Sequence, residues 1–509
     1  MSSPATGRPR TPGPAGPVGP VGPVGSVGSV GSVTSVGTVA AVDLGATSGR
    51  VILGTVGNGE LRLRHVSRFA NDPVQLADGL HWNILEIYRQ VLNGLADAER
   101  QSPGAIASVG IDSWAVDYGL LRGKSLLGVP YHYRDERTAA GVTSVHKHFT
   151  AAELYGRNGL QHLPFNTVFQ LACEKDSGLL DVADRLLLIP DLLGFWLTGK
   201  AVAERTNAST TGLLNPRDGS WDSELLATLG ISGTLLAGLV DAGTPVGPLT
   251  DQAASVVGRA LEVVTVGSHD TASAVVAVPN TGRDFAYISC GTWGLVGLEL
   301  DEPVFSDAAR QANFTNEGGV DGRIRFLHNV MGLWLLSESV RSWDRAANSS
   351  QRSSNLEQLL AEAEAAPAPP AVFDVDDPRF MAPGDIPGRI AGWYAEHDLP
   401  APSTPPQVVR AIIESLAQAF ADTVLKAVRI AGTPVEVIHF MGGGAQNRLL
   451  CQATADRSGL PVLAGPVEAT AVGNILVQAR TAGLVEGGLA EMRELVVRAF
   501  PPVRYEPRA

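Results

Sequence analysis

The chain has 509 residues, which is more than one ordinary hydrophobic core accommodates, so its length predicts two or three domains. Hydrophobic residues make up 44% and charged residues 18%, a composition that excludes a wholly disordered chain. The formal net charge is -13, and a surface of that sign repels phosphate backbones, so we expect no nucleic-acid partner.

Cysteine usage and hydropathy indicate the cellular compartment of the protein. Cys173, Cys290 and Cys451 are widely spaced and form no CxxC pair, which argues against a disulfide scaffold or a zinc site. No apolar run reaches the roughly 18–20 residues of a membrane span. No apolar segment follows a basic start at the N-terminus, as a secretory signal requires. We therefore expect a cytoplasmic protein without a membrane partner.

The first 37 residues are low in complexity, with Gly, Pro, Ser and Val in near-triplet repeats. Glycine at every third position is typical of collagen, but this run is too short and too poor in proline for a triple helix. The composition predicts a disordered N-terminal tail over residues 1–37.

Regular structure is expected to begin directly after the tail. Residues 38–43 form a short apolar run, residues 44–49 a polar turn rich in small side chains, and residues 50–56 a second apolar run, which together predict a β-hairpin. Residues 106–112 read as a buried strand, and residues 118–121 as a neighbouring strand.

The strand–turn–strand pattern recurs in the second half, at residues 285–290, 291–294 and 295–300. Two such units, one opening each half, suggest two domains of related design. We place these domains at residues 38–279 and 280–505.

The remainder of the second half contains an irregular segment and then a clear α/β pattern. Residues 365–404 are rich in Ala and Pro and predict an excursion without regular structure. Apolar residues recur every three to four positions over 408–428, which predicts an amphipathic helix. A strand at 435–440, a glycine loop at 442–447 and a helix at 448–458 follow, an order typical of α/β nucleotide sites.

The first turn has the chemistry of a phosphate-binding loop. Gly45 and Gly49 allow a phosphate to approach backbone N–H groups, and hydroxyls and one guanidinium add donors. A plain hairpin turn is the alternative, and the GxxxxGK[ST] pattern of a P-loop is absent. The carboxylate that precedes the turn could hold Mg²⁺ through water. The candidates here are Asp43, Ala46, Thr47, Ser48, Gly49 and Arg50.

Two later turns offer the same kind of contact. Thr292 lies in the turn at 291–294 and could bind phosphates from the opposite domain. Gly443 lies in a triple glycine that could seat an adenosine, because side chains there would block a flat base and ribose. Each turn also has a purely structural interpretation, as a hairpin or as a tight strand–helix connection. Their order along the chain, with the first turn, matches the ATP cleft of the actin/Hsp70/hexokinase-like fold.

Asp270 is the acid–base candidate. Phosphoryl transfer depends mainly on positioning and charge stabilisation, with one carboxylate that orients the attacking hydroxyl and accepts its proton. Asp270 follows an apolar strand and is flanked by His269 and Thr271. A helix N-cap is the structural alternative for an Asp at this position.

Residues 110–119 place two carboxylates and Trp114 around a strand end, an arrangement that suits the apolar faces and polar rim of a sugar. A core tryptophan with strand-capping aspartates is the alternative. Residues 313–317 and 327–334 carry amide and imidazole groups just before a helix, and Asn329 is the sugar-binding candidate among them.

These residues together resemble the FGGY family of carbohydrate kinases over residues 39–505. The resemblance is carried by VDLGATSGRV at 42–51, GIDSWAVDYGLL at 110–121, SHDTASAV at 268–275, YISCGTWGLVGLE at 287–299, NFTNEGG at 313–319, HNVMGLWLL at 328–336 and MGGGAQNRLL at 441–450. Within the family, SHDTASAV and the NFTNEGG and HNVMGLWLL strings are most similar to members that act on L-rhamnulose.

The resemblance implies an α/β protein with two actin-like (ribonuclease H-like) domains around a central ATP and sugar cleft. It implies transfer of a phosphoryl group from MgATP to the 1-hydroxyl of L-rhamnulose, by a monomer or homodimer. Asp270 is implied as proton acceptor, with Ala115, His269, Thr271 and Asn329 at the sugar. Residues 46–50, Thr292, Ser337 and Gly443 are implied at ATP.

Two positions depart from the family pattern. Ala115 stands where the family often has Gly, and Ser337 stands where it often has Gln. A kinase for another ketose, L-fuculose or xylulose, therefore stays open as an alternative. So does a non-catalytic nucleotide switch of the actin or Hsp70 kind, which would have no need of Asp270. The paired late cysteines of some relatives are missing, so the resemblance implies no disulfide.

Overall fold

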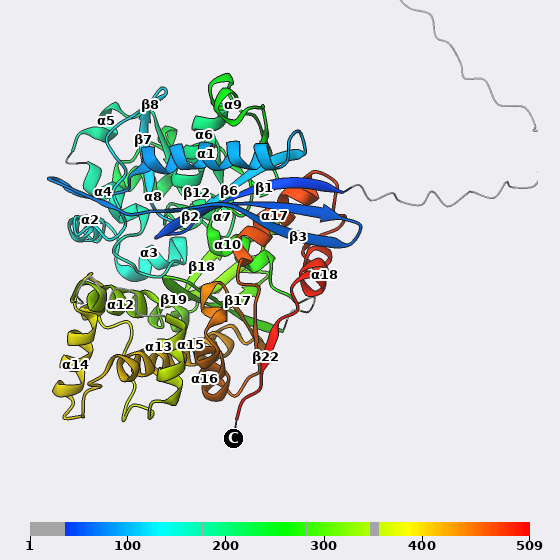
Figure 1. Ribbon diagram of the computed structural model, residues 1–509. Coiled ribbons are helices and arrows are strands. Elements are labelled where there is room, and N and C mark those ends of the chain that lie inside the picture. The colour runs from blue at the N-terminus through cyan, green and yellow to red at the C-terminus, as the bar shows by residue number, and fades with distance from the viewer. Residues whose placement is uncertain (1–35, 176, 281, 283, 347–355, 509) are drawn as a thin grey trace, which may run out of the picture. The chain divides into compact units, whose positions relative to one another are not determined.

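The computed structural model describes residues 36–175, 177–280, 282, 284–346 and 356–508, and Figure 1 shows their arrangement. Of the tail predicted over residues 1–37, residues 1–35 lie outside this description. Gly37 already begins the first strand. Among the described residues, no helix is both long enough and apolar enough to cross a membrane.

The first sheet has six strands in the order β14-β15-β6-β1-β2-β3. β1 pairs antiparallel with β2 and parallel with β6, while β3 extends the antiparallel side and β15 the parallel side. The predicted hairpin is confirmed, with its turn between β1 and β2. The strands are β1 Gly37–Leu44, β2 Ser48–Gly57, β3 Glu60–Ala70, β6 Ile106–Ser113, β14 Pro245–Pro248 and β15 Glu262–Val264.

The second sheet repeats this plan with seven strands in the order β18-β19-β17-β16-β20-β21-β22. Its first strand, β16, again pairs antiparallel with the next strand and parallel with β20, and β21 extends the parallel side. The related design expected from the two sequence units is thus present in the pairing. The strands are β16 Phe285–Cys290, β17 Trp293–Leu300, β18 Thr315–Gly318, β19 Ile324–Met331, β20 Val437–Met441, β21 Val462–Ala464 and β22 Val503–Tyr505.

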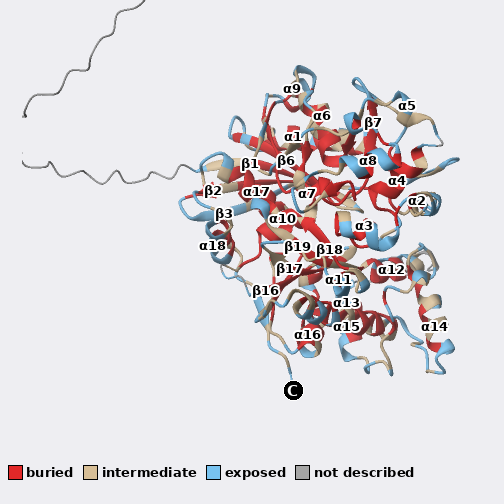
Figure 2. Cartoon of the chain, turned by 180° about the vertical axis from the view of Figure 1, so that it is seen from behind, coloured by how far each residue is buried: buried red, intermediate tan, exposed pale blue. Residues whose placement is uncertain are grey.

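Residues 39–42 of the central strand β1 are all apolar because helices cover the sheet on both faces. Ala40 and Val42 pack in the cluster that contains α1 (Ile84–Gln101), and Val39 and Ala41 pack in the cluster that contains α17 (Ala469–Thr481). A strand buried on both faces reads as a continuous apolar run rather than an alternating one. The buried colour of Figure 2 follows these central strands.

Two helices join the halves of the structure. α10 (Asp270–Val276) follows the last parallel strand of the first sheet, and α17 follows that of the second sheet. A Cβ atom on Gly473 would lie 1.8 Å from the backbone oxygen of Ser273, so the two helices touch at backbone distance. This contact fixes the start of α10, where Asp270 lies, against the C-terminal part of the chain.

Two expectations about local structure are wrong. β7 (Tyr118–Arg122) does not neighbour β6, because it pairs with β8 (Ser125–Leu126) and β9 (Arg185–Leu188) in a separate sheet. The segment 365–404 is not wholly irregular, since it contains η3 (Pro378–Phe380) and α14 (Ile386–Glu396). Pro387 lies in the first turn of α14, where a missing N–H costs nothing.

The predicted helices of the second half are present. The amphipathic helix is α15 (Pro405–Ala431), and the helix after the glycine loop is α16 (Arg448–Ser458), with η4 (Gly443–Gln446) between strand and helix. The remaining helices of the first half are α2 Thr138–Val145, α3 Ala151–Asn158, α4 Thr167–Glu174, α5 Leu179–Val182, α6 Ile189–Thr198, α7 Arg205–Ala208, α8 Ser223–Leu229, η1 Gly233–Leu235 and α9 Asp251–Val257. The remaining helices of the second half are α11 Asp307–Gln311, η2 Val320–Gly322, α12 Trp334–Ala346, α13 Leu356–Ala365 and α18 Leu489–Ala499. The small strands are β4 Val74–Leu76, β5 Gly79–His81, β10 Ala203–Glu204, β11 Leu214–Asn215, β12 Ser220–Trp221 and β13 Leu239–Val240.

Candidate active site

A cavity of about 300 Å³ is lined by turns and strand ends from both halves of the structure. It brings together most of the residues singled out from the sequence. From the first half they are Asp43, Ala46, Thr47, Ser48, Arg50, Trp114, Ala115, His269, Asp270 and Thr271, and from the second half Thr292, Asn329 and Gly443.

The first turn connects β1 to β2 with its hydroxyl-bearing residues at the cavity. The N–H of Gly45 donates to the carbonyl of Ser48 (2.9 Å), and the amide of Asn71 donates to the carbonyl of Gly45 (2.9 Å). Gly49 is outside the cavity lining. A Cβ there would meet the ring of Phe69 at 2.3 Å, so packing explains this glycine rather than the approach of a phosphate.

The other two glycine turns face the cavity from the second sheet. Thr292 lies between β16 and β17, and Gly442 and Gly443 follow β20. Gly442 has φ +79°, a conformation that a side chain disfavours, and a Cβ there would lie 2.9 Å from the carbonyl oxygen of Cys290. A Cβ on Gly443 would meet nothing within 4 Å, so this position opens onto free space.

Asp43, the last residue but one of β1, lies in a cluster of charges. Arg50 reaches its carboxylate at 2.9 Å and reaches Glu468, before α17, at 2.8 Å. Burial raises the pKa of Asp43 to about 6, although the Arg50 charge lowers it, and the charges of Asp270 and Glu468 add to the rise. Carboxylates that repel one another at a cavity wall attract a cation.

Asp112 lies beside Asp43 in register on β6 and is fully buried. The amide of Asn474, on α17, donates to one of its oxygens at 2.6 Å, and the other oxygen has no hydrogen-bond partner. Burial raises the pKa of Asp112 well above its usual range, and the Asp43 charge adds to the effect. Asp112 does not line the cavity, so its role is to hold β6 against α17.

Mg²⁺ carried with a nucleotide takes one or two carboxylates plus phosphate oxygens and water. Asp43 and Asp270 are two carboxylates at one cavity, next to the hydroxyls of Thr47 and Ser48. Among the residues that the structure describes, no group of three or more His, Cys, Asp or Glu is placed to hold a metal by itself. The donor set therefore fits a metal that arrives with phosphates.

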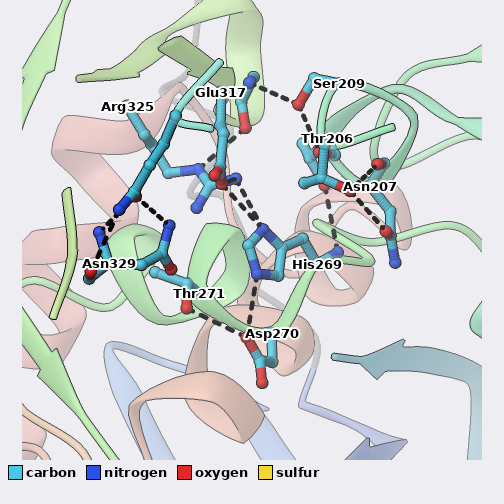
Figure 3. A network of polar contacts seen from close by, with 12 residues as sticks. Thr206, Asn207, Ser209, His269, Asp270, Thr271, Glu317, Arg325 and Asn329 are labelled. Atoms are coloured by element: carbon cyan, nitrogen blue, oxygen red, sulfur yellow. Dashed lines mark hydrogen bonds and ion pairs between the residues drawn. The ribbon is translucent and has the colours of Figure 1, made fainter. Parts of the chain in front are cut away.

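Asp270 is the first residue of α10 and presents its side chain to the cavity, with 30% of the side chain exposed. The helix N-cap is His269 rather than Asp270, so the capping alternative does not account for the carboxylate. The hydroxyl of Thr271 donates to Oδ1 of Asp270 at 3.0 Å, and Nε2 of His269 lies 3.4 Å from the same oxygen. Figure 3 shows Oδ2 of Asp270 pointing away from these contacts.

The backbone before Asp270 is held by a buried carboxylate, Glu204, that sequence reasoning missed. Oε2 of Glu204 accepts from the N–H (3.0 Å) and hydroxyl (2.8 Å) of Ser268. The same oxygen accepts from the N–H groups of Thr206 (3.0 Å) and Asn207 (3.2 Å) at the start of α7. The N–H of His269 donates to the hydroxyl of Thr206 at 3.3 Å. No local pattern reveals the contact with Ser268, because Ser268 lies 64 residues away along the chain.

The ring of His269 contacts the second sheet. Its Nδ1 lies 2.9 Å from Nη2 of Arg325, on β19, and 3.3 Å from Oε2 of Glu317, on β18, as Figure 3 shows. Arg325 and Glu317 are themselves 3.0 Å apart. Burial raises the pKa of Glu317, but the charges and hydrogen bonds of Arg325 and His269 together outweigh burial, and the net pKa lies below the ordinary value. The sequence singled out residues 313–317 for their amides but did not identify Glu317 or Arg325.

Asn329 is fixed from across the cavity by Gln161, a further residue that the sequence did not reveal. Oε1 of Gln161 accepts from the N–H (2.8 Å) and the side-chain amide (2.9 Å) of Asn329, and its own amide donates to the Asn329 carbonyl (3.3 Å). The carbonyl that accepts from Gln161 belongs to the main chain of Asn329, so the side-chain Oδ1 is left to accept from a ligand hydroxyl, and the second amide N–H is left to donate.

Two further residues singled out from the sequence do not line the cavity. Asp117 is buried and accepts from the indoles of Trp82 (2.6 Å) and Trp114 (3.1 Å), so it belongs to the core and orients Trp114. Ser337 is exposed on α12 and lies outside the cavity lining.

The two sheets have the same pattern of strand pairing, and the cavity combines glycine turns with a carboxylate. These features define a phosphotransferase of the actin-like fold. The model of the FGGY family of carbohydrate kinases matches this chain with its N-terminal domain over residues 38–277 and its C-terminal domain over residues 286–482. The chain belongs to the FGGY family of carbohydrate kinases. It is a sugar kinase whose substrates are ATP and a sugar.

Its relatives include rhamnulokinases. The rhamnulokinase of Bacteroides thetaiotaomicron is 39% identical over 472 residues, which cover 92% of this chain and 95% of the relative. That of Pectobacterium carotovorum is 41% identical over 477 residues, which cover 92% and 93%.

Solved structures share the fold. The xylulose kinase of Lactobacillus acidophilus is similar with a TM-score of 0.75 at 18% identity, covering 92% of this chain and 94% of that one. Plasmodium falciparum glycerol kinase with ADP is similar with a TM-score of 0.73 at 14% identity, covering 93% and 94%.

Proposed function

We propose that this sugar kinase transfers the γ-phosphoryl group of ATP to the 1-hydroxyl of L-rhamnulose, a step of L-rhamnose catabolism. The observation that carries the proposal is the cavity in which the carboxylate of Asp270 meets the glycine turns of both sheets. The choice of sugar is supported by the identity of 39–41% to rhamnulokinases over nearly the whole chain.

Asp270 is the proposed proton acceptor. An ordinary aspartate is too weak a base to remove an alcohol proton early, but it can accept the proton as the O–P bond forms. Its Oδ2 points away from the Thr271 and His269 contacts, and Asp270 lines the cavity. The other proposed sugar contacts are Ala115, His269, Thr271 and Asn329, all in the cavity lining.

The proposed ATP contacts surround the three turns. Ala46, Thr47, Ser48 and Arg50 bind phosphates from the first sheet, Thr292 binds them from the second, and Gly443 seats the adenosine. Mg²⁺, held through water by Asp43, supplies positive charge to the phosphates. Ser337 remains a predicted ATP contact that needs α12 to approach the nucleotide, and closure of the two domains on the substrates would bring such an approach and exclude water.

The proposed domains are residues 38–279 and 280–505. The family models support this division, since one ends at 277 and the other begins at 286. We further propose a cytoplasmic enzyme that acts as a monomer or homodimer.

A coupled ADP-release assay across a panel of ketoses tests the proposal. We expect the highest kcat/KM with L-rhamnulose, ahead of L-fuculose and D-xylulose. A higher kcat/KM with another ketose would reject the substrate assignment while retaining the kinase. ATP hydrolysis that is independent of every sugar and stimulated by a protein partner would instead indicate a nucleotide switch.

A further inference from the structure

The two ring nitrogens of His269 face different halves of the protein. Nε2 lies 3.4 Å from Oδ1 of Asp270, whereas Nδ1 lies 2.9 Å from Nη2 of Arg325 on β19. We propose that Arg325, with Glu317 as its counter-charge, is a positioning residue that fixes His269 in the tautomer with hydrogen on Nε2, so that the ring orients the carboxylate of Asp270. This inference rests on the proposed function of Asp270.

The tautomer follows from what each partner of Nδ1 can do. A guanidinium has only donors, so at 2.9 Å from Nη2 the Nδ1 atom has to accept. A neutral imidazole carries one N–H, which then lies on Nε2. Glu317 favours the opposite arrangement, because its Oε2, 3.3 Å from Nδ1, could accept from an Nδ1–H. The Arg325 contact is shorter and has hydrogen-bond geometry, whereas the contact of Nδ1 with Glu317 does not, and Oε2 of Glu317 is an ion-pair partner of Arg325 at 3.0 Å.

Arg325 is held so that it cannot turn away from the ring. Its side chain is fully buried, and its Nε donates to the carbonyl of Gly318 at 2.9 Å. A guanidinium keeps its charge under all ordinary conditions, so it is a permanent donor. The donor that faces Nδ1 is therefore fixed in place, in charge and in direction.

The backbone of His269 is fixed separately. Its N–H donates to the hydroxyl of Thr206, and the preceding Ser268 is bound by the buried carboxylate of Glu204. The first half thus holds the main chain of His269 and the second half holds its ring. Neither set of contacts alone would set the direction of Nε2.

The tautomer of His269 determines what each of the two oxygens of Asp270 can do. Oδ1 accepts from Thr271 at 3.0 Å and faces Nε2–H of His269, while Oδ2 is left for the sugar hydroxyl. With hydrogen on Nδ1 instead, the bare lone pair of Nε2 would face Oδ1 and repel it. A general base acts only when it lies within hydrogen-bond reach of the proton it takes, so this repulsion would displace the reacting oxygen.

Nitrogen NMR of the full-length protein, labelled with ¹⁵N in histidine, reads the tautomer directly. His269→Asn assigns the two signals by their loss. We expect the wild type to show a protonated Nε2 and an unprotonated Nδ1 at His269. In Arg325→Met we expect hydrogen on Nδ1, which then faces Glu317. A wild-type ring with hydrogen on Nδ1, or an unchanged ring in Arg325→Met, would overturn the inference.

Matched variants separate this role from simple stabilisation. Arg323→Met removes a nearby arginine that pairs with Glu299 and Asp301 rather than with His269, and we expect its tautomer and kcat to match the wild type. Arg325→Lys retains a donor without an acceptor, so we expect it to keep hydrogen on Nε2. Glu317→Gln retains the arginine, so its tautomer should also stay. If Arg325→Met fails to fold, a tautomer change in Arg325→Lys or Glu317→Gln would refute the assignment.

Kinetics complete the test. A partner that orients a metal-ligating histidine is worth about tenfold or more in activity, and we expect the same of a partner that orients His269. We expect Arg325→Met to lower kcat by at least that factor with little change in the KM for ATP, and Arg325→Lys to recover part of the loss. A shifted tautomer with wild-type kcat would overturn the link to Asp270. The NMR measurement needs no sugar, so an inactive wild type would refute the proposed function without touching the tautomer result.

Discussion

Asp270→Asn is the most direct perturbation of the proposed chemistry. The substitution exchanges one carboxylate oxygen for an amide nitrogen of similar size at a side chain that is 30% exposed, so packing is preserved. The amide cannot accept the proton of the sugar hydroxyl. Loss of a positioned general base costs about 10²–10⁴-fold in rate. That range corresponds to roughly 2.7–5.4 kcal/mol of transition-state stabilisation.

Nucleotide binding should survive the same change. The proposed ATP contacts lie on three turns that Asp270 does not support, and removal of one negative charge from the cavity does not weaken phosphate binding. We therefore expect kcat to fall by orders of magnitude while the Kd for ADP, measured by calorimetry, changes little.

A coupled ADP-release assay with L-rhamnulose gives kcat. The matched control is Asp307→Asn on α11, where 83% of the side chain is exposed and wild-type kcat is expected. Wild-type kcat in Asp270→Asn would refute the assignment of the proton acceptor. Equal losses of kcat and of ADP binding would show that the substitution had damaged the whole site.

Three further predictions concern the framework of the site. Gly473→Ala should lower the melting temperature, because overpacking at the α10–α17 contact costs about 1–3 kcal/mol. Its control is Gly156→Ala at an exposed position of α3, where a Cβ meets nothing within 4 Å, and this variant should not be destabilised. Glu204→Gln should lose about 1–3 kcal/mol in urea unfolding and lower kcat as well, because one oxygen of Glu204 accepts both from α7 and from the loop before Asp270. Unchanged unfolding would contradict this. Burial raises the pKa of Asp117 from 3.8 to about 7, so the folded state retains a proton that the unfolded chain releases. This group therefore removes stability as pH rises from about 4 to about 7. Asp117→Asn should lessen that fall, and identical pH profiles of unfolding would count against the shift.

Much of the site was predictable because its parts are local. The β1–β2 and β16–β17 hairpins depend on apolar runs interrupted by small residues, and the sequence shows both. The same holds for the glycine loop before α16, whose helix begins and ends as predicted. Short-range preferences for turns and for periodic burial decide these elements, so no knowledge of distant contacts was needed.

The failures concern contacts between distant segments. The strand at Tyr118 was recognised, but its partner was not, since β9 lies about 65 residues further along the chain. Gly49 is small because of the ring of Phe69 on the next strand. Strand register or side-chain packing determines each of these features, and neither can be read from a local sequence pattern.

The sequence by itself determined the order of turns, the carboxylate at Asp270 and the family to which the chain belongs. Only the tertiary structure decided which groups act on that carboxylate. Glu204 reaches its loop from 64 residues away, and Arg325 reaches His269 from 56 residues away. Strand pairing and the contact between the two sheets bring such partners together. Whether two side chains far apart in the sequence point toward each other depends on the folded backbone and not on the residues alone.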